Sequence, residues 1–252
     1  MKLQTCFFIL AFLIVWGCKD QPSKQTSEMA SPEEPASHES AETSAWITLF
    51  DGTSMEAWKG YGKDELPEHW KIEEGAMVFD PPETKPEGAS YNLVTREEYT
   101  NFVLSLEWKI SEGGNSGIFW GVKEDPKYGQ PYETGPEIQV LDNAAHPDAK
   151  NGTTHQAGAL YDMVAPTRDV TRPAGNWNLC EITVDYNAGE GKVVMNGEEI
   201  VRFPLTEEAW NAMVSKSKFD GWDGFGIFHT GKIGLQDHGD WVAYRNIKIK
   251  PL

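Results

Sequence analysis

The stretch "NFVLSLEWKISEGGNSGIFWGV", residues 101–122, decides the fold that the sequence predicts. Its first half alternates with a period of two, as expected of a β-strand with one buried face. The apolar residues of this alternation are Phe102, Leu104, Leu106 and Trp108. Gly113 and Gly114 then allow the chain to turn without a Cβ penalty, and a second apolar strand follows. The stretch therefore predicts two strands joined by a glycine-containing turn.

The rest of the chain after residue 45 repeats this pattern of short strands between Gly, Pro, Asn and Asp turns. Asn196-Gly197 is a type I′ hairpin signal, and only residues 206–217 show a helical pattern. We therefore predict an all-β fold, a jelly-roll sandwich of two antiparallel sheets with one short helix near 206–217. The predicted strands are 45–50, 69–80, 101–111, 116–123, 137–142, 157–163, 178–186, 192–204, 231–238 and 242–252.

The N-terminal 44 residues are predicted not to belong to the folded domain. Residues 1–17 have a basic start and an apolar run that is too short to span a bilayer, which is typical of a secretory signal. Gly17-Cys18 resembles a bacterial lipobox, so we expect a lipoprotein signal peptide with Cys18 lipidated; an ordinary signal with an incidental Cys18 is the alternative. Residues 18–44 are rich in Ser, Glu and Pro, which predicts a disordered acidic tether. The protein is then expected in the bacterial cell envelope, lipid-anchored and facing the periplasm or the cell surface.

Charge and cysteine content limit which partners and which cysteine chemistry we expect of the predicted single domain, residues 45–252. Residues 1–44 hold three of the 22 basic and six of the 39 acidic residues, so the domain keeps an excess of 14 acids. This excess argues against nucleic acid as a partner. Cys180 is the domain's lone cysteine, so no internal disulfide is possible, and its place in an apolar alternation predicts a buried thiol.

The segment "GPEIQVLDN", residues 135–143, carries the strongest chemical signal. On a strand, Ile138 and Val140 share one face while Glu137 and Gln139 share the other, as in a sugar-binding sheet; an ordinary polar strand face is the alternative. The spacing of Glu137, Gln139 and Asp142 resembles the three acids of laminarinase-type glycosidases, with two departures. Five residues of strand span roughly 16 Å, whereas retaining carboxylates lie about 5 to 5.5 Å apart. A conventional retaining mechanism is therefore disfavoured.

Six sequence blocks, in order, resemble the 3-keto-disaccharide hydrolase domain family, whose members have been described as secreted glycosyl hydrolases. The resemblance implies a concanavalin A-like jelly roll acting on 3-keto sugars that a separate oxidoreductase makes from glycosides. The blocks are "ITLFDGTSMEAWKGY" (47–61), "NLVTREEYTNFVLSLEWKISEGGNSGIFWGV" (92–122), "YETGPEIQVLDN" (132–143), "AGALYDMVAP" (157–166), "PAGNWNLCEITV" (173–184) and "GKIGLQDHGDWVAYRNIKIK" (231–250).

Cleavage next to a 3-keto group needs different chemistry from ordinary glycoside hydrolysis. The ketone at C3 acidifies the C2 proton, so a base forms an enolate, an acid helps to expel the C1 substituent, and water adds back. His238 in "LQDHGD" is the best proton carrier, and its neighbouring carboxylates predict a pKa near or above neutrality. A turn histidine without chemistry is the alternative. Glu137, His238 and Asp142 are thus the candidate catalytic residues.

A larger set of residues is predicted to bind the substrate. Asn115 and Ser116 offer short donors and acceptors for sugar hydroxyls, and Trp120 is placed to stack on a pyranose. The set comprises Asn115, Ser116, Trp120, Gln139, Glu107, Tyr161, Asp162, Gln236 and Arg245. No zinc-like spacing, phosphate-binding loop or EF-hand occurs. A divalent cation, either a structural calcium or a catalytic metal, remains an alternative, because loop carboxylates are suitable ligands for it. A conventional glycosidase, a non-catalytic carbohydrate-binding module and a structural envelope domain remain alternatives.

Overall fold

The structure is a computed structural model, and it describes residues 45–252. The predicted signal peptide (1–17), the lipidation site Cys18 and the predicted tether (18–44) lie outside the described residues. Within the described residues, no helix is long and apolar enough to cross a membrane.

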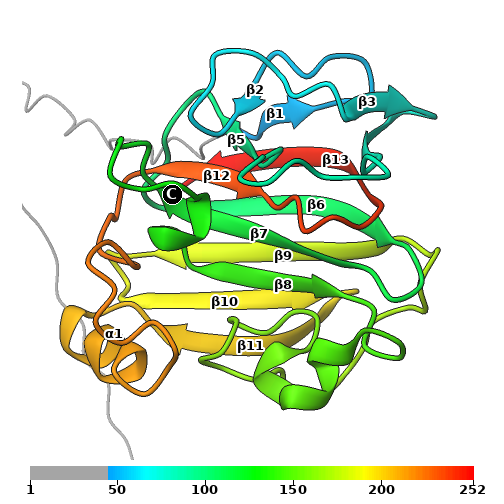
Figure 1. The fold of residues 1–252 in the computed structure, drawn as a ribbon. Coiled ribbons are helices and arrows are strands. Elements are labelled where there is room, and N and C mark those ends of the chain that lie inside the picture. Colours follow the sequence, from blue (N-terminus) through cyan, green and yellow to red (C-terminus); the bar gives the residue numbers. More distant parts are fainter. Residues whose placement is uncertain (1–44) are drawn as a thin grey trace, which may run out of the picture. The chain divides into compact units, whose positions relative to one another are not determined.

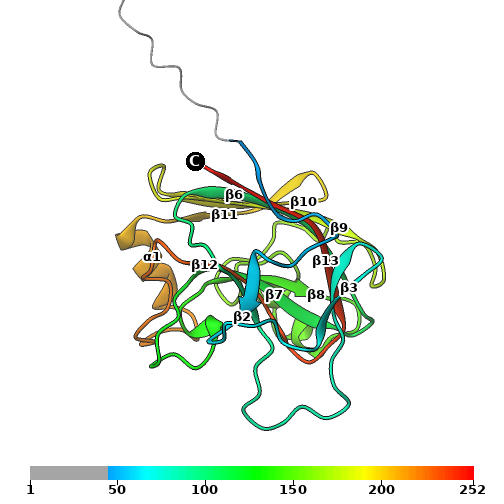
Figure 2. The ribbon, with the colours of Figure 1, turned by 90° about the horizontal axis from the view of Figure 1, so that it is seen from above.

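The predicted all-β sandwich is confirmed: two antiparallel sheets form two layers (Figures 1 and 2). The eight-stranded sheet has the order β11-β10-β9-β6-β13-β4-β3, with β1 paired to β13, and the five-stranded sheet has the order β2-β5-β12-β7-β8. The first sheet consists of β1 (Ile47–Phe50), β3 (Trp70–Glu73), β4 (Ala76–Phe79), β6 (Phe102–Ile110), β9 (Asn178–Asp185), β10 (Glu190–Met195), β11 (Glu198–Pro204) and β13 (Val242–Pro251). The second consists of β2 (Trp58–Gly60), β5 (Leu93–Thr95), β7 (Asn115–Val122), β8 (Glu137–Leu141) and β12 (Lys232–Leu235).

The core lies between the sheets and follows the period of the strands. The apolar residues of β6 are almost fully buried, and the neighbouring strand β9 adds Cys180 and Ile182. Cys180 is a free, buried thiol, as predicted, and burial raises its pKa to about 12. Cys180 therefore packs in the core as a protonated thiol and is not suited to act as a nucleophile.

Short elements confirm some local predictions and correct others. Asn196 and Gly197 both have positive φ angles, of 51° and 87°, as a type I′ turn between β10 and β11 requires. The helix α1 (Glu207–Val214) is shorter than the predicted 206–217. The predicted strand 157–163 is wrong, because this segment makes only isolated bridges at Leu160. Strands β2 and β5 were not predicted, and three 3₁₀ helices occur: η1 (Pro131–Glu133), η2 (Pro147–Asn151) and η3 (Thr153–His155).

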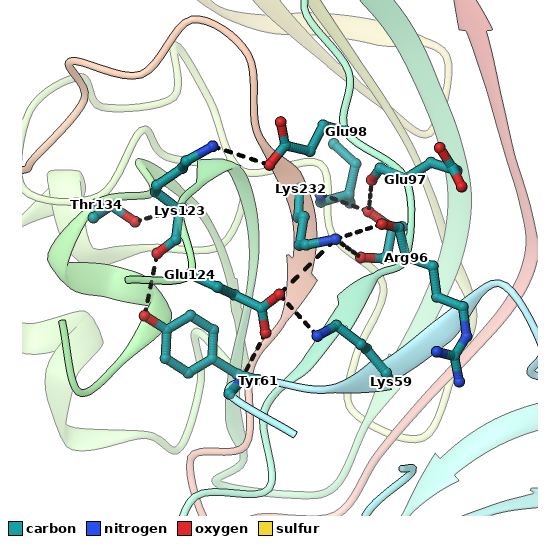
Figure 3. A network of polar contacts seen from close by, with 12 residues as sticks. Lys59, Tyr61, Arg96, Glu97, Glu98, Lys123, Glu124, Thr134 and Lys232 are labelled. Atoms are coloured by element: carbon teal, nitrogen blue, oxygen red, sulfur yellow. Dashed lines mark hydrogen bonds and ion pairs between the residues drawn. The ribbon is translucent and has the colours of Figure 1, made fainter. Parts of the chain in front are cut away.

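A polar network anchors the chain after β7 to the neighbouring strands (Figure 3). The buried ammonium of Lys232 on β12 donates hydrogen bonds to the carbonyl oxygens of Thr95, at 2.9 Å, and of Arg96. Burial lowers the pKa of Lys232. The Tyr61 hydroxyl donates to the carbonyl of Tyr128 at 3.0 Å.

The same network fixes both ends of the segment 123–134. The Thr134 hydroxyl accepts the Lys123 amide at 3.0 Å, and Glu124 forms an ion pair of 2.9 Å with Lys59 on β2. Lys232 Nζ on β12 also lies 3.9 Å from Glu124 Oε2, so residues 123–134 are held against the five-stranded sheet by contacts from β2, from β12 and from Tyr61.

Candidate active site

A cavity of about 180 Å³ lies on the face of the five-stranded sheet that points away from the other sheet. Residues of β7 and β8 form its floor, and the loops around residues 132, 161, 218–222 and 236–238 form its walls. The lining residues are Asn115, Tyr132, Glu137, Gln139, Tyr161, Lys218, Phe219, Trp222, Gln236 and His238. The structure thus brings together six of the residues predicted as site residues: Asn115, Glu137, Gln139, Tyr161, Gln236 and His238.

The pairing of β7 with β8 explains why Glu137 and Gln139 share this cavity. Gly117 lies opposite Gln139 in the antiparallel register, and the Glu137 side chain folds across Gly117. A Cβ atom on Gly117 would lie 2.0 Å from Glu137 Oε1, so only glycine leaves room for this carboxyl group. Ile138 and Val140 point to the core, as the alternation predicts.

Glu137 is the most perturbed acid of the cavity. Its carboxyl group is buried, and this desolvation raises its pKa from 4.5 to about 8. Lys218 opposes the rise and Asp148 adds to it. Within residues 45–252 the carboxyl group accepts no hydrogen bond that would hold it ionised. At pH 7 Glu137 is therefore mostly protonated, so the cavity contains a carboxylic acid that can donate a proton.

The turn after β12 carries His238 and is held in place by Asp237. The buried Asp237 carboxylate binds Lys85 Nζ at 2.6 Å and accepts the Tyr91 amide at 3.0 Å and the Gly239 amide at 3.1 Å. Its own amide donates to Asn92 Oδ1 at 2.8 Å. These contacts fix the turn so that Gln236 and His238, on either side of Asp237, line the cavity.

The expectation of a near-neutral or raised pKa for His238 is wrong. Desolvation lowers the pKa of His238 below 6.5, and His146 lowers it further, although Asp240 and Asp237 act in the opposite direction. The Asp240 carboxylate accepts the Asn115 backbone amide at 3.0 Å, and within residues 45–252 the His238 ring forms no ion pair. The sequence correctly places carboxylates nearby, but burial outweighs them. His238 is thus a neutral imidazole at pH 7 and can accept a proton.

Two buried amide oxygens in the cavity have no hydrogen-bond partner among the described residues, Asn115 Oδ1 and Gln236 Oε1. The Asn115 amide nitrogen lies 3.4 Å from His238 Nε2. Since an unpaired buried polar atom costs free energy, both oxygens are suited to accept hydrogen bonds from a ligand. Sugar hydroxyls supply such donors.

A second group of residues, which sequence reasoning largely missed, supports the cavity wall. Asp148 accepts hydrogen bonds from the Tyr161 hydroxyl at 2.9 Å and contacts His155 at 3.0 Å. His155 also contacts Asp162 at 3.0 Å, and Asp162 accepts the Lys218 backbone amide. The Lys218 ammonium lies 4.1 Å from the centre of the Tyr161 ring. Asp162 therefore positions the wall without lining the cavity, and Lys218 brings the cavity its positive charge.

The structure places Ser116 and Trp120 in the core, away from the cavity. The Ser116 hydroxyl donates to the Gln236 carbonyl at 2.7 Å and contacts the Tyr244 hydroxyl at 2.8 Å. Trp120 stacks on Phe203 with 5.7 Å between the ring centroids. The prediction that Trp120 stacks on a sugar is therefore wrong, because its face of β7 packs against the other sheet.

Three further predicted site residues also lie elsewhere. Glu107 and Arg245 are cross-strand neighbours on β6 and β13, and Arg245 Nη2 donates to Glu107 Oε2 at 2.7 Å on the outer face of the eight-stranded sheet. Asp142 accepts the amides of Gly113 at 2.8 Å and Ala144 at 3.1 Å, so it holds a turn. Glu137 and Asp142 do not share a cavity, which weakens the two-carboxylate alternative.

A larger cavity of about 870 Å³ next to Asp142 is a weaker candidate. Two of its carboxylates, Asp142 and Asp169, are bound within loops: Asp169 accepts hydrogen bonds from the Thr171 hydroxyl and from Asn143, which lower its pKa. It therefore lacks the pairing of a buried acid and a histidine that the cavity with Glu137 has. Among the described residues, no group of three His, Cys, Asp or Glu side chains is placed to hold a metal ion.

Comparisons with known proteins show which family the chain belongs to. Residues 45–250 match the model of the 3-keto-alpha-glucoside-1,2-lyase-like domain. A protein named 3-keto-disaccharide hydrolase, from Bacteroides thetaiotaomicron, is 37% identical over 91% of this chain and 84% of its own length.

Solved structures give the same result. The crystal structure of a candidate glycosyl hydrolase from Parabacteroides distasonis aligns with a TM-score of 0.74 at 32% identity, over 82% of this chain and 94% of that chain. The structure named BuGH16Bwt aligns with a TM-score of 0.50 at 10% identity, over 83% of this chain and 94% of that chain, which shows the fold alone. The family model covers almost all of the folded chain, and the 37% identical relative covers 91% of the whole chain. The protein therefore belongs to the 3-keto-alpha-glucoside-1,2-lyase-like family and is a glycosyl hydrolase.

Proposed function

We propose that this enzyme cleaves the glycosidic bond of 3-keto-glycosides by removing the C2 proton. The observation that carries the proposal is the pairing, in one cavity, of a protonated acid and a neutral base. Glu137 has a raised pKa of about 8 and His238 a lowered one. At neutral pH each group is in the protonation state that elimination next to a ketone requires.

In the proposed first stage, His238 takes the proton from C2 of the sugar. The electron pair of the C–H bond forms the enolate, which collapses to a C1–C2 double bond as the C1–oxygen bond breaks. Glu137 gives its proton to the leaving oxygen. Lys218, whose charge acts on Glu137, is the group best suited to face the developing enolate oxygen.

In the second stage, water adds to C1 of the unsaturated sugar. Glu137, now a carboxylate, takes a proton from this water, and the protonated His238 returns a proton to C2. Both residues end in their starting states, and the products are a 3-keto sugar and the free alcohol. The unpaired oxygens of Asn115 and Gln236, with Gln139, orient the ring by accepting hydrogen bonds from its hydroxyl groups.

The test compares a 3-keto-glucoside with its unoxidised parent, using the wild type, Glu137→Gln and His238→Ala. We expect turnover of the keto substrate alone, and a loss of at least about 100-fold in each variant, as is typical when one positioned acid or base is removed. Glu107→Gln is the matched control, because Glu107 lies on the outer face of the other sheet. Equal activity on both substrates, or full activity in both site variants, would refute the proposal.

We further propose that the substrate comes from an oxidoreductase acting on glycosides, because 3-keto sugars arise by oxidation of the C3 hydroxyl. We also propose that lipidation of Cys18 anchors the enzyme to the bacterial cell envelope. The support for the anchor is the sequence of residues 1–18 alone.

A further inference from the structure

The active-site cavity is small for a two-ring substrate. Its volume of about 180 Å³ is less than the roughly 300 to 1,000 Å³ of pockets that hold drug-sized ligands. This volume suits a single pyranose ring, and Glu137 and His238 both line it. The group that leaves from C1 has to lie outside this cavity.

A second groove, of about 620 Å³, adjoins the cavity on one side. Tyr132 and Trp222 line both spaces, so they stand at the boundary between them. Their rings lie 6.3 Å apart at an angle of 53°, which makes an open V that can contact a ring from two directions. The groove therefore offers space for a group that extends out of the cavity past these two residues.

Tyr132 and Trp222 are unusually exposed for large aromatic residues, at 40% and 39% of their surface. The groove also has charged groups at its rim, where Lys127 forms an ion pair of 2.9 Å with Asp223. Aromatic faces with polar groups at the edge match a pyranose, which has apolar C–H faces and hydroxyls around its rim.

The two segments that carry these aromatic residues are fixed to each other. The Gly226 amide donates to the Thr134 carbonyl at 2.8 Å, and Gly224 packs on the Tyr128 ring, where a Cβ atom would come within 2.5 Å. The network in Figure 3 holds the segment 123–134 against the sheet, through Tyr61 and Thr134. The groove is therefore a preformed surface, which lowers the entropy cost of binding.

We propose that Tyr132 and Trp222 form the leaving-group subsite and bind a second pyranose ring, so that the enzyme prefers disaccharides to simple alkyl glycosides. This inference rests on the proposed function for the placement of the first ring. The C–H faces of the second ring lie against the two aromatic residues, and its hydroxyls reach the charged rim formed with Lys127 and Asp223.

The experiment compares Trp222→Ala and Tyr132→Ala on a 3-keto-α-glucosyl-glucose disaccharide and on methyl 3-keto-α-glucoside. For the disaccharide, kcat/KM should fall by about tenfold in each variant, mainly through KM, as expected when one aromatic contact is lost. For the methyl glycoside the loss should be clearly smaller, because both side chains line the catalytic cavity but only the disaccharide also loses a contact with its second ring. Leu179→Ala, an equally exposed position on β9, should change neither.

Equal losses on both substrates, or no loss on the disaccharide, would overturn the subsite. If the wild type converts neither keto substrate, the proposed function fails while the subsite is still tested by calorimetry with the unoxidised disaccharide and methyl glucoside. The wild type should then bind the disaccharide more tightly, and both variants should lose that difference. Equal binding of the two sugars by the wild type would refute the subsite independently of catalysis.

Discussion

Glu137→Gln should make the protein more stable at alkaline pH while it reduces activity. The folded protein keeps the Glu137 proton between pH 4.5 and about 8, whereas the unfolded chain has already lost it above 4.5. Folding therefore takes up a proton in this window, and the free energy of unfolding falls as pH rises through it. Glutamine has nearly the same shape and never ionises, so the variant escapes this loss.

The size of the effect follows from the pKa values. A shift from 4.5 to about 8, at 1.36 kcal/mol for each pKa unit, corresponds to a penalty on the order of 5 kcal/mol above pH 8. For a domain of this size, that difference moves the unfolding midpoint by roughly 10 to 20 °C. Thermal unfolding of wild type and variant at pH 4.0 and pH 8.5 measures it. The two midpoints should be similar at pH 4.0 and separate at pH 8.5, with the variant higher.

Glu107→Gln is the control, because hydrogen bonds from Arg245 and Asn246 stabilise the Glu107 carboxylate and lower its pKa. The change in stability should have the opposite sign: Glu107→Gln should destabilise the protein above pH 4.5. If Glu137→Gln is no more stable than the wild type at pH 8.5, Glu137 ionises normally and cannot be the protonated acid of the site.

Three further predictions test the site and the anchor. Gly117→Ala should displace the Glu137 carboxyl, which a Cβ atom would meet at 2.0 Å, and lower kcat by about 100-fold; unchanged activity would contradict the packing. The pH profile of kcat/KM should rise through a pKa below 6.5, as His238 loses its proton, and fall near pH 8, as Glu137 ionises. His238→Ala should lose the rise on the acidic side, and a variant that keeps this rise would exclude His238 as the base. Cys18→Ser should release the protein from membrane fractions, and undiminished membrane association would argue against lipidation.

The part of the site on regular strands was predictable from sequence, since strand alternation alone shows that Glu137 and Gln139 share a face. The same alternation groups Ser116 with Trp120, but it does not say which face of β7 meets the other sheet. All eight residues of β7 are buried, so neither hydrophobicity nor polarity separates its two sides. The sequence analysis therefore assigned Ser116 and Trp120 to substrate binding, although both lie on the core face of β7.

The residues from loops were not predictable in the same way. Lys218, Tyr132 and Trp222 reach the cavity through contacts that span long sequence distances, such as the Thr134–Gly226 hydrogen bond. No local pattern encodes such contacts. The pKa of His238 shows a related limit, since a neighbouring carboxylate is visible in sequence whereas the degree of burial depends on tertiary packing.

Turnover of the 3-keto substrate in heavy water tests the central claim most directly, because the proposed reaction breaks and remakes the bond between C2 and its proton. We predict that the product carries deuterium at C2, or that an unsaturated 2-hydroxy-3-keto sugar accumulates when the addition of water is slow. Both outcomes are read by nuclear magnetic resonance and mass spectrometry. Cleavage by direct displacement at C1 leaves C2 untouched, so a product with no deuterium at C2 and no unsaturated intermediate would contradict the mechanism.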